Sequence, residues 1–192
     1  MTLSTIFLAR HGQTEWSIAH RHTGRTDLPL TAAGEVDGRK LGERLHGTAF
    51  ARVFSSPLIR AKRTAELAGY HPEIEPDLRE WDYGEYEGKT STEIRAGRPG
   101  WLLFRDGPAG GESVAAIQAR VDRQVAKLKD LSGNILCFAH GHLLRVLAAR
   151  WVNEPVVFAS SLLLDTASVS VLSFNHGKLD EPAIRVWNST EC

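Results

Sequence analysis

Two histidines far apart in the chain stand in closely similar surroundings. His11 follows an apolar run and lies between Arg10 and Gly12, and His140 also follows an apolar run and precedes Gly141. A neutral imidazole can attack phosphorus and carry the transferred group on a ring nitrogen. A guanidinium binds phosphate oxygens through paired N–H groups and stays charged. These residue types in this arrangement predict phosphoryl chemistry with a histidine nucleophile.

A third position of interest is Arg60, which falls in the first turn of a predicted helix. We expect its side chain to face the two histidines, whereas Lys62 and Arg63 are expected to form a solvated face of the same helix. Arginines close to an imidazole favour its neutral, nucleophilic form. A metal site made of two or three histidines is the alternative for these residues, but no carboxylate cluster with metal-ligand spacing accompanies them. We therefore predict neither a metal nor a cofactor.

These residues need a scaffold that brings them together. The short apolar runs that precede them read as buried strands, each followed by a helix. Strands that alternate with helices predict an α/β fold, a three-layer αβα sandwich with a mostly parallel central sheet. Such sheets bind ligands beyond the carboxyl ends of their strands, where helix N-termini also point. The fold class thus places three strand-to-helix junctions on one edge, at 10–12, 55–60 and 140–142.

The periodicity gives bounds for most elements. A helix over 31–46 is capped by Thr31 and is expected to turn one apolar face inward; that face comprises Ala33, Val36, Leu41 and Leu45. The next helix is expected to take Ser56 as its N-cap and Pro57 as its first residue and to end near Ala68. Ser113 caps a strongly periodic helix with Val114, Ile117, Val121, Val125 and Leu128 on one stripe. The remaining elements are strands at 5–9, 52–54, 135–139, 167–174 and 182–187 and a helix at 142–152.

The middle of the chain, about 76–112, is rich in glycine and acidic residues and lacks a clear period. We predict one domain over 1–192, in which 76–112 forms an irregular, lid-like segment.

Composition limits the classes of partner. The 192 residues include 23 Lys and Arg against 23 Asp and Glu, a balance that disfavours a nucleic-acid backbone or an anionic membrane as the main partner. No window approaches the roughly 20 apolar residues of a membrane span, and Arg10 interrupts the first apolar run too early for a signal peptide. The cysteines, Cys137 and Cys192, are expected to be reduced thiols. We therefore predict a cytoplasmic protein.

The motifs together resemble the histidine phosphatase superfamily, the phosphoglycerate-mutase-like proteins. The match covers nearly the whole chain in the family's order, and its specificity comes from seven motifs occurring together. They are Leu8-Ala9-Arg10-His11-Gly12-Gln13-Thr14-Glu15-Trp16, Arg21-His22-Thr23-Gly24 with Leu28-Pro29-Leu30-Thr31, Ser55-Ser56-Pro57-Leu58-Ile59-Arg60-Ala61, Leu78-Arg79-Glu80-Trp81-Asp82-Tyr83-Gly84, Gly111-Glu112-Ser113, Ala139-His140-Gly141-His142 and Thr166-Ala167-Ser168.

The resemblance implies roles for individual residues. His11 is implied as the nucleophile, and Arg10, Arg60 and His140 as the groups that complete the phosphate pocket. Glu80 is implied as the proton donor to the leaving oxygen. The residues alone do not make that choice, because five carboxylates lie close together in this stretch: Asp77, Glu80, Asp82, Glu85 and Glu87.

A second group of residues is expected to touch phosphate or substrate: the side chains of Gln13 and Thr23, the backbone of Gly24 and the amide of Gly141. Ser17 is added to them, although similar mutases usually carry asparagine at its position; a serine hydroxyl can still donate one hydrogen bond. His142 is expected to be a helix-start residue or to support the residues that touch substrate, and not to be a catalyst. No role is assigned to the other histidines, His20, His22, His46, His71 and His176.

The resemblance implies a phosphatase of the superfamily, with a small phosphorylated metabolite as substrate, either a phosphomonoester or a sugar bisphosphate. The alternative is a phosphoglycerate mutase, an isomerase that uses the same phosphohistidine. The short segment 88–111 favours hydrolysis, because cofactor-dependent mutases that resemble this chain carry a longer one with paired arginines. A non-catalytic phosphate-binding protein is disfavoured because His11, Glu80 and the arginines are all present. The apolar segment 101–104 and the late strands leave a homodimer open.

Overall fold

The structure is a computed structural model that describes residues 3–191. Its centre is one six-stranded sheet with the strand order β3-β2-β4-β1-β5-β6. Strands β3, β2, β4 and β1 run parallel, whereas β5 and β6 are antiparallel additions at one edge. The strands are β1 (Ser4–Arg10), β2 (Arg52–Ser55), β3 (Glu73–Ile74), β4 (Gly133–Ala139), β5 (Val169–Phe174) and β6 (Pro182–Ser189).

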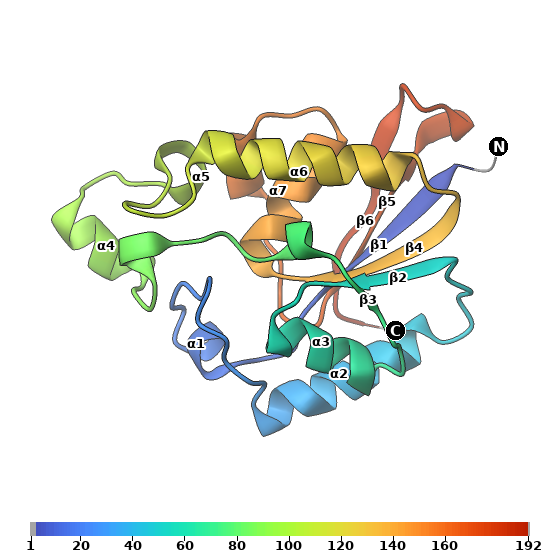
Figure 1. Ribbon diagram of the computed structural model, residues 1–192, viewed down its shortest axis with the longest axis horizontal. Coiled ribbons are helices and arrows are strands. Elements are labelled where there is room, and N and C mark those ends of the chain that lie inside the picture. Colours follow the sequence, from blue (N-terminus) through green and yellow to red (C-terminus); the bar gives the residue numbers. More distant parts are fainter. Residues whose placement is uncertain (1–2, 192) are drawn as a thin grey trace.

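Helices cover both faces of the sheet (Figure 1). One layer contains α2 (Ala32–Leu45) and α3 (Ile59–Leu67), and the opposite layer contains α6 (Val114–Lys129) and α7 (Gly141–Trp151). This arrangement confirms the predicted sandwich with a mostly parallel sheet. The shorter helical segments are α1 (Glu15–Ile18), α4 (Ser91–Gly97), α5 (Leu103–Asp106) and the 3₁₀ turns η1 (Pro76–Leu78), η2 (Gly84–Tyr86), η3 (Val156–Ser161) and η4 (Asn175–Gly177).

The central strand β4 contributes side chains to the hydrophobic cores on both faces of the sheet, because successive side chains of a strand point to opposite faces. Ile135 and Cys137 pack into the core beneath α6 and α7, whereas Leu136 and Phe138 pack into the core beneath α2 and α3. All four side chains are fully buried. A strand buried on both faces is what the uninterrupted apolar run predicts.

The predicted bounds of strands and helices agree with the structure to within two residues. The apolar stripe predicted for α6 is confirmed, because Ile117, Val121, Val125 and Leu128 are buried and Ser113 caps the helix. The face predicted for α2 is partly wrong. Leu41 and Leu45 are buried, but Ala33 and Val36 are exposed, and Gly34 and Gly38 occupy the rest of the buried face.

The predicted start of α3 is also wrong. Its first helical residue is Ile59, two positions after Pro57, and the N-cap residue is Leu58 without a side-chain cap. The Ile59 N–H instead donates to Asp27 Oδ1 at 2.8 Å. Ser56, predicted as the cap, is buried and hydrogen-bonded to a histidine. The different start still leaves Arg60 in the first turn, with its side chain fully buried.

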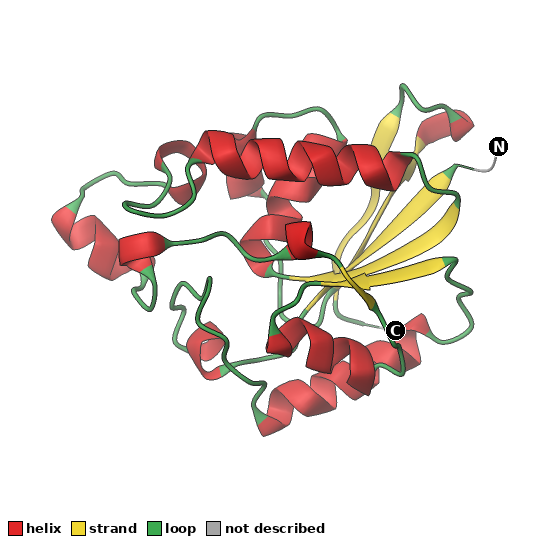
Figure 2. Cartoon of the chain, viewed as in Figure 1, coloured by secondary structure: helices red, strands yellow, loops and turns green. Residues whose placement is uncertain are grey.

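The segment 76–112 departs from strand–helix alternation, as predicted, and consists mainly of loops, 3₁₀ turns and the short helices α4 and α5 (Figure 2). Aromatic residues anchor it to the core: Trp81, Tyr83, Trp101 and Phe104 are all buried. Among residues 3–191, no helix combines the length and hydrophobicity needed to cross a membrane. Cys137 is a buried free thiol, and burial raises its pKa to about 12; Cys192 lies outside the described residues.

Candidate active site

The parallel pairing of β1 with β4 brings the two histidines together. Arg10 stands opposite Ala139 in the register, so His11 and His140 are the next residues beyond the carboxyl ends of adjacent strands. The His11 N–H donates to the Ala139 carbonyl at 3.0 Å, which extends the ladder by one bond. The centres of the two imidazole rings lie 5.2 Å apart. The predicted meeting of these residues at one sheet edge is thus observed.

The His11 ring is held in a single useful tautomer. Its Nδ1 lies 2.7 Å from the Gly12 carbonyl oxygen, which can only accept, so Nδ1 carries the hydrogen. Burial, followed by the positive charges of Arg60 and Arg10, holds the pKa of His11 well below its usual range. The imidazole is therefore neutral near pH 7 and its Nε2 has a free lone pair. This is the form that a nucleophile requires.

The loop after His11 is fixed by a close approach of two backbones. A side-chain carbon at Gly12 would come within 2.4 Å of the Gly34 carbonyl oxygen, and one at Gly34 within 2.1 Å of the Gln13 carbonyl oxygen. Both positions therefore require glycine. The Gly12 N–H donates to Thr64 Oγ1 at 3.0 Å, which ties the same loop to α3.

His140 has no free ring nitrogen. Its Nδ1 accepts a hydrogen bond from Arg60 Nε at 3.1 Å, so its Nε2 carries the hydrogen and donates to Ser56 Oγ at 2.7 Å. The ring is fully buried. Burial and the charge of Arg60 hold the pKa of His140 well below its usual range. The geometry thus gives His140 the contacts of a residue that supports its neighbours.

Arg60 lies behind the two rings with most of its donors in use. Besides His140, its guanidinium donates to the carbonyls of Thr26 at 3.0 Å, Thr23 at 2.9 Å and Gly24 at 3.1 Å. Asp27 lies 4.0 Å away. Arg60 therefore supplies a buried positive charge next to His11 and holds the loop 23–26 in place.

Arg10, in contrast, keeps donors available. Its Nη1 donates to the Leu164 carbonyl at 2.5 Å, and its buried Nε has no hydrogen-bond partner among the described residues. It forms no ion pair within residues 3–191, and burial lowers its pKa. A carbon added at Gly141 would lie 3.3 Å from the Arg10 guanidinium, so the absence of a side chain there lets Arg10 lie over the start of α7. A buried cation without a carboxylate favours an anionic ligand.

Glu80 lies at the N-terminus of α7. Its Oε1 accepts from the N–H groups of Trp81 at 2.8 Å and Leu143 at 2.9 Å, and its Oε2 accepts from the N–H of His142 at 3.0 Å. A carboxylate oxygen has about two acceptor sites. Oε1 is therefore saturated, and Oε2 retains one position for a proton or a ligand.

These groups open onto a cavity of about 240 Å³. Of the predicted site residues, it is lined by Arg10, His11, Ser17, Thr23, Glu80 and Gly141. His140 and Arg60 lie behind this lining rather than in it. Two predicted contacts lie elsewhere: Gln13 accepts a hydrogen bond from the Thr31 hydroxyl at 2.9 Å, and the Gly24 N–H donates to Glu87 at 2.8 Å. The Ser17 hydroxyl is also engaged, with the backbone of Thr14.

The prediction from sequence missed one wall of this cavity. It contains His22, Tyr83, His142 and Arg145, together with Arg21 and Ser91. Tyr83 Oη lies 2.5 Å from His142 Nδ1, and the His22 ring stacks near both rings. Burial lowers the pKa of His22 to about 4 and that of His142 well below its usual range. His142 lies in the first turn of α7, as predicted, but it also faces the cavity.

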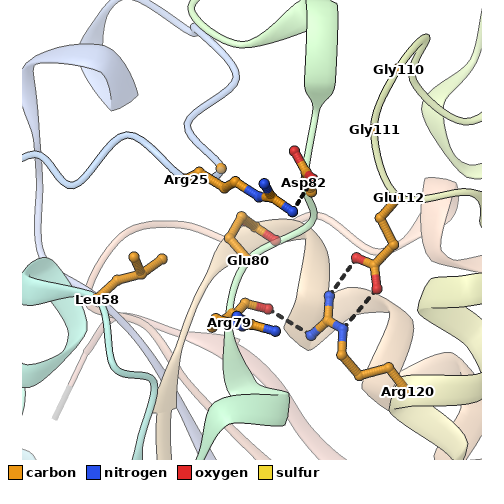
Figure 3. A pocket seen from close by; sticks show the side chains of 10 residues that line it. Arg25, Leu58, Arg79, Glu80, Asp82, Gly110, Gly111, Glu112 and Arg120 are labelled. Carbon is orange, nitrogen blue, oxygen red and sulfur yellow. Dashed lines mark hydrogen bonds and ion pairs between the residues drawn. The ribbon is translucent and has the colours of Figure 1, made fainter.

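A larger cavity of about 720 Å³ also has Glu80 in its lining (Figure 3). Its cations include Arg25, which pairs with Asp82 at 2.8 Å, and Arg120, which forms two bonds with Glu112 at 2.8 and 2.6 Å. The guanidinium of Arg120 is thus directed at a carboxylate of the protein. Glu80 lines both cavities, but His11 lines only the smaller one.

A neutral histidine beside an unpaired arginine, at the carboxyl edge of a mostly parallel sheet, has the features of an α/β enzyme of phosphoryl transfer. Comparison with known families agrees: the model described as "Histidine phosphatase superfamily (branch 1)" matches residues 6–190. The chain belongs to this superfamily, which confirms the resemblance seen in the sequence.

Several known proteins are similar to this chain over most of their length. The acid phosphatase of Mycobacterium tuberculosis is 41% identical, covering 90% of this chain and 87% of the relative. The sedoheptulose 1,7-bisphosphatase of Saccharomyces cerevisiae is 32% identical, covering 93% and 90%. A Salmonella choleraesuis protein named "Probable phosphoglycerate mutase" is 30% identical, covering 90% and 86%. The solved structure of the open reading frame Rv3214 from Mycobacterium tuberculosis superposes with a TM-score of 0.91 at 36% identity, covering 98% and 99%.

Proposed function

We propose that this protein hydrolyses phosphomonoesters of small metabolites through a phosphohistidine on His11. The observation that carries the proposal is the pairing of a neutral His11, whose Nε2 is free, with an Arg10 guanidinium that has no carboxylate partner among the described residues. The similarity to an acid phosphatase and to a sugar bisphosphatase supports hydrolysis as the outcome.

In the first step, His11 Nε2 attacks phosphorus and the bond to the leaving oxygen breaks. Arg10 and the N–H of Gly141 hold the phosphoryl oxygens, so charge that moves onto them meets donors that are already oriented. The Nδ1–H bond to Gly12 keeps the ring in the attacking tautomer as positive charge develops on it.

Glu80 serves as general acid and then as general base. Its Oε2, the carboxylate oxygen with an open position, gives a proton to the leaving oxygen in the first step. In the second step the same oxygen takes a proton from the water that attacks the phosphohistidine, which releases inorganic phosphate and restores His11.

His140 and Arg60 act as positioning residues. His140 packs against the His11 ring, and Arg60 holds both His140 and the carbonyls of the loop 23–26. Their contacts favour a fixed His11 ring and a positive potential behind it. We further propose that the chain is a single domain in which segment 76–112 acts as a lid. Two residues of this segment, Glu80 and Tyr83, line the cavity that contains His11.

The proposed function is tested by identifying the products of the reaction. The wild-type protein is incubated with p-nitrophenyl phosphate and with 3-phosphoglycerate, and the inorganic phosphate and any isomerised phosphoglycerate are measured. We expect phosphate release from the aryl ester and no isomerisation. Isomerisation faster than hydrolysis would identify a mutase, and undiminished hydrolysis by His11→Ala, with His71→Ala as the matched exposed control, would overturn the proposal.

Two further properties stay predictions from the sequence. A cytoplasmic location rests on Cys137, which is a buried free thiol, as expected in a reducing compartment. The burial of Trp101, Leu103 and Phe104 removes segment 101–104 as a dimer surface, so a homodimer rests on the late strands alone, where Val186 is exposed. Fractionation and light scattering test them.

A further inference from the structure

The cavity beside His11 contains a second cation that the proposed reaction does not use. Arg145 lies in the second turn of α7 and lines the cavity. Its Nε donates to the Ala159 carbonyl at 3.0 Å, and its Nη2 donates to the Ser160 carbonyl at 3.2 Å. The guanidinium also lies 4.6 Å from the centre of the Phe104 ring. Three contacts therefore hold it in one orientation before any ligand binds.

The charge of Arg145 is not neutralised by the protein. Two of its five N–H groups donate to carbonyls, which leaves three, and it forms no ion pair within residues 3–191. Burial lowers its pKa to about 10, so the guanidinium is partly removed from water yet stays charged near pH 7. A partly desolvated cation with open donors is stabilised by an anion that accepts paired hydrogen bonds.

The larger cavity provides a contrast. There, Arg25 and Arg120 pair with Asp82 and Glu112 (Figure 3), and the third arginine of the lining, Arg79, is exposed and forms no ion pair within residues 3–191. In the smaller cavity, neither Arg10 nor Arg145 has a carboxylate partner among the described residues. The unpaired arginine of the larger cavity is thus exposed to water, whereas the unpaired arginines of the smaller cavity, Arg10 and Arg145, are largely removed from it.

The two unmatched arginines are spaced along α7. Arg10 lies over Gly141, and Arg145 follows Gly141 by four residues, so it lies on the same face one turn further along the helix. One turn corresponds to a rise of about 5.4 Å. A small molecule whose phosphate lies at Arg10 therefore presents its far end to Arg145.

We propose that Arg145 forms a second anion subsite, so that the preferred substrate carries a phosphoryl ester and a further anionic group at its other end. The further group is a second phosphate or a carboxylate, since both accept the paired N–H groups of a guanidinium. This inference rests on the proposed function and adds the class of substrate to it.

The test compares phosphate esters that carry one anionic group with phosphate esters that carry two. Values of kcat and KM are measured with p-nitrophenyl phosphate, fructose 6-phosphate, fructose 1,6-bisphosphate and 3-phosphoglycerate, for the wild type and for Arg145→Gln. The wild type is expected to prefer at least one substrate with two anionic groups over fructose 6-phosphate. Arg145→Gln is expected to lower kcat/KM for that substrate at least about tenfold more than for the aryl ester, chiefly through KM, as for the loss of a charged hydrogen bond.

Two variants separate charge from folding. Arg145→Lys keeps the charge and is expected to recover part of the preference. Arg150→Gln, on the same helix but bound to Asp122 outside the cavity, is expected to leave the ratio between substrates unchanged. Equal losses for all substrates in Arg145→Gln, or no wild-type preference for a second anion, would overturn the subsite while hydrolysis of the aryl ester still stands. The absence of wild-type hydrolysis of every substrate would instead overturn the proposed function.

Discussion

The two His–Gly junctions of this protein share a sequence pattern and a place at the sheet edge, yet their histidines differ in what their rings can do. His11 donates from Nδ1 to a backbone carbonyl and presents a free Nε2 to the cavity. His140 receives Arg60 on Nδ1 and donates from Nε2 to Ser56. The difference arises from the hydrogen-bond partners of each ring: His11 uses the carbonyl of its own junction, whereas Arg60 and Ser56 occupy both ring nitrogens of His140. It shows that strand–His–Gly places an imidazole, while its neighbours decide whether it reacts or supports.

The largest effect is expected from alanine substitution of the two histidines, which should differ in kcat and in whether a phosphohistidine forms. His140→Ala is expected to lower kcat by about 10²-fold through loss of support for the His11 ring, and still to form the phosphohistidine. His11→Ala is expected to lower kcat by at least about 10⁴-fold and to form none. Rapid quenching at alkaline pH with ³²P-labelled substrate measures the trapped adduct. An adduct in His11→Ala, or its loss in His140→Ala, would reverse the assignment.

Glu80, the proposed general acid, is bound by backbone N–H groups just after the His140-Gly141 junction. Its carboxylate accepts the N–H groups of His142 and Leu143, so the turn after His140 holds the acid in place. Glu80→Gln is expected to slow hydrolysis of fructose 6-phosphate by about 10²-fold, because an alkoxide leaves poorly without a proton. The loss with p-nitrophenyl phosphate is expected to be several-fold smaller, because its leaving group is far less basic.

The neighbouring carboxylate Asp82 supplies the control for this measurement. It pairs with Arg25 on the rim of the larger cavity, outside the cavity that contains His11. Asp82→Asn is expected to leave the ratio between the two substrates as it is in the wild type. A ratio unchanged in Glu80→Gln as well would remove Glu80 from the role of acid.

Much of this arrangement is predictable from the sequence. The strand runs, the stripe on α6 and the position of Arg60 in a first turn follow from local periodicity. The buried face of α2 does not, because Gly34 packs through its backbone against the loop after His11, and a hydrophobic pattern gives glycine no weight. The resemblance singled out Glu80 among five carboxylates, and the structure adds a physical distinction, its position at the N-terminus of α7.

The wall of the cavity that the sequence did not reveal depends on tertiary folding. His22 and Tyr83 lie in loops whose partners are far along the chain, so no local spacing brings them together. The position of Arg145, in contrast, could have been predicted from the sequence. It follows Gly141 by four residues on a predicted helix, which places both residues on one face of that helix.

His11 and His140 are expected to contribute alike to the pH dependence of the free energy of unfolding. Burial keeps both imidazoles neutral in the folded protein and holds their pKa values below the usual 6.5, whereas the unfolded chain binds a proton at each below that pH. The free energy of unfolding is therefore expected to fall as the pH is lowered from about 6.5. Each histidine contributes a slope of about 1.4 kcal/mol per pH unit.

Urea unfolding of the variants between pH 6.5 and 5 measures these slopes. His11→Ala and His140→Ala should each flatten the pH dependence of the free energy of unfolding by about one proton relative to the wild type. A slope as steep as that of the wild type in either buried variant would show that the replaced imidazole is already charged in the folded state, and for His11 this would contradict the neutral nucleophile.

The smallest expected effects come from one hydroxyl beside each junction. Thr64 Oγ1 accepts the Gly12 N–H beside His11, and Ser56 Oγ accepts the Nε2–H of His140. Thr64→Val and Ser56→Ala each leave one buried donor without a partner, so each is expected to lower the free energy of unfolding by about 1–3 kcal/mol. Their effects on kcat should differ. Thr64→Val loosens the loop that fixes the attacking ring and is expected to lower kcat about tenfold, whereas Ser56→Ala loosens only the supporting ring and is expected to lower kcat about threefold. If the two variants lose equal stability but Thr64→Val loses more kcat, the junctions differ in their part in the reaction and not in their part in folding. A larger loss of kcat in Ser56→Ala would contradict the supporting role of His140.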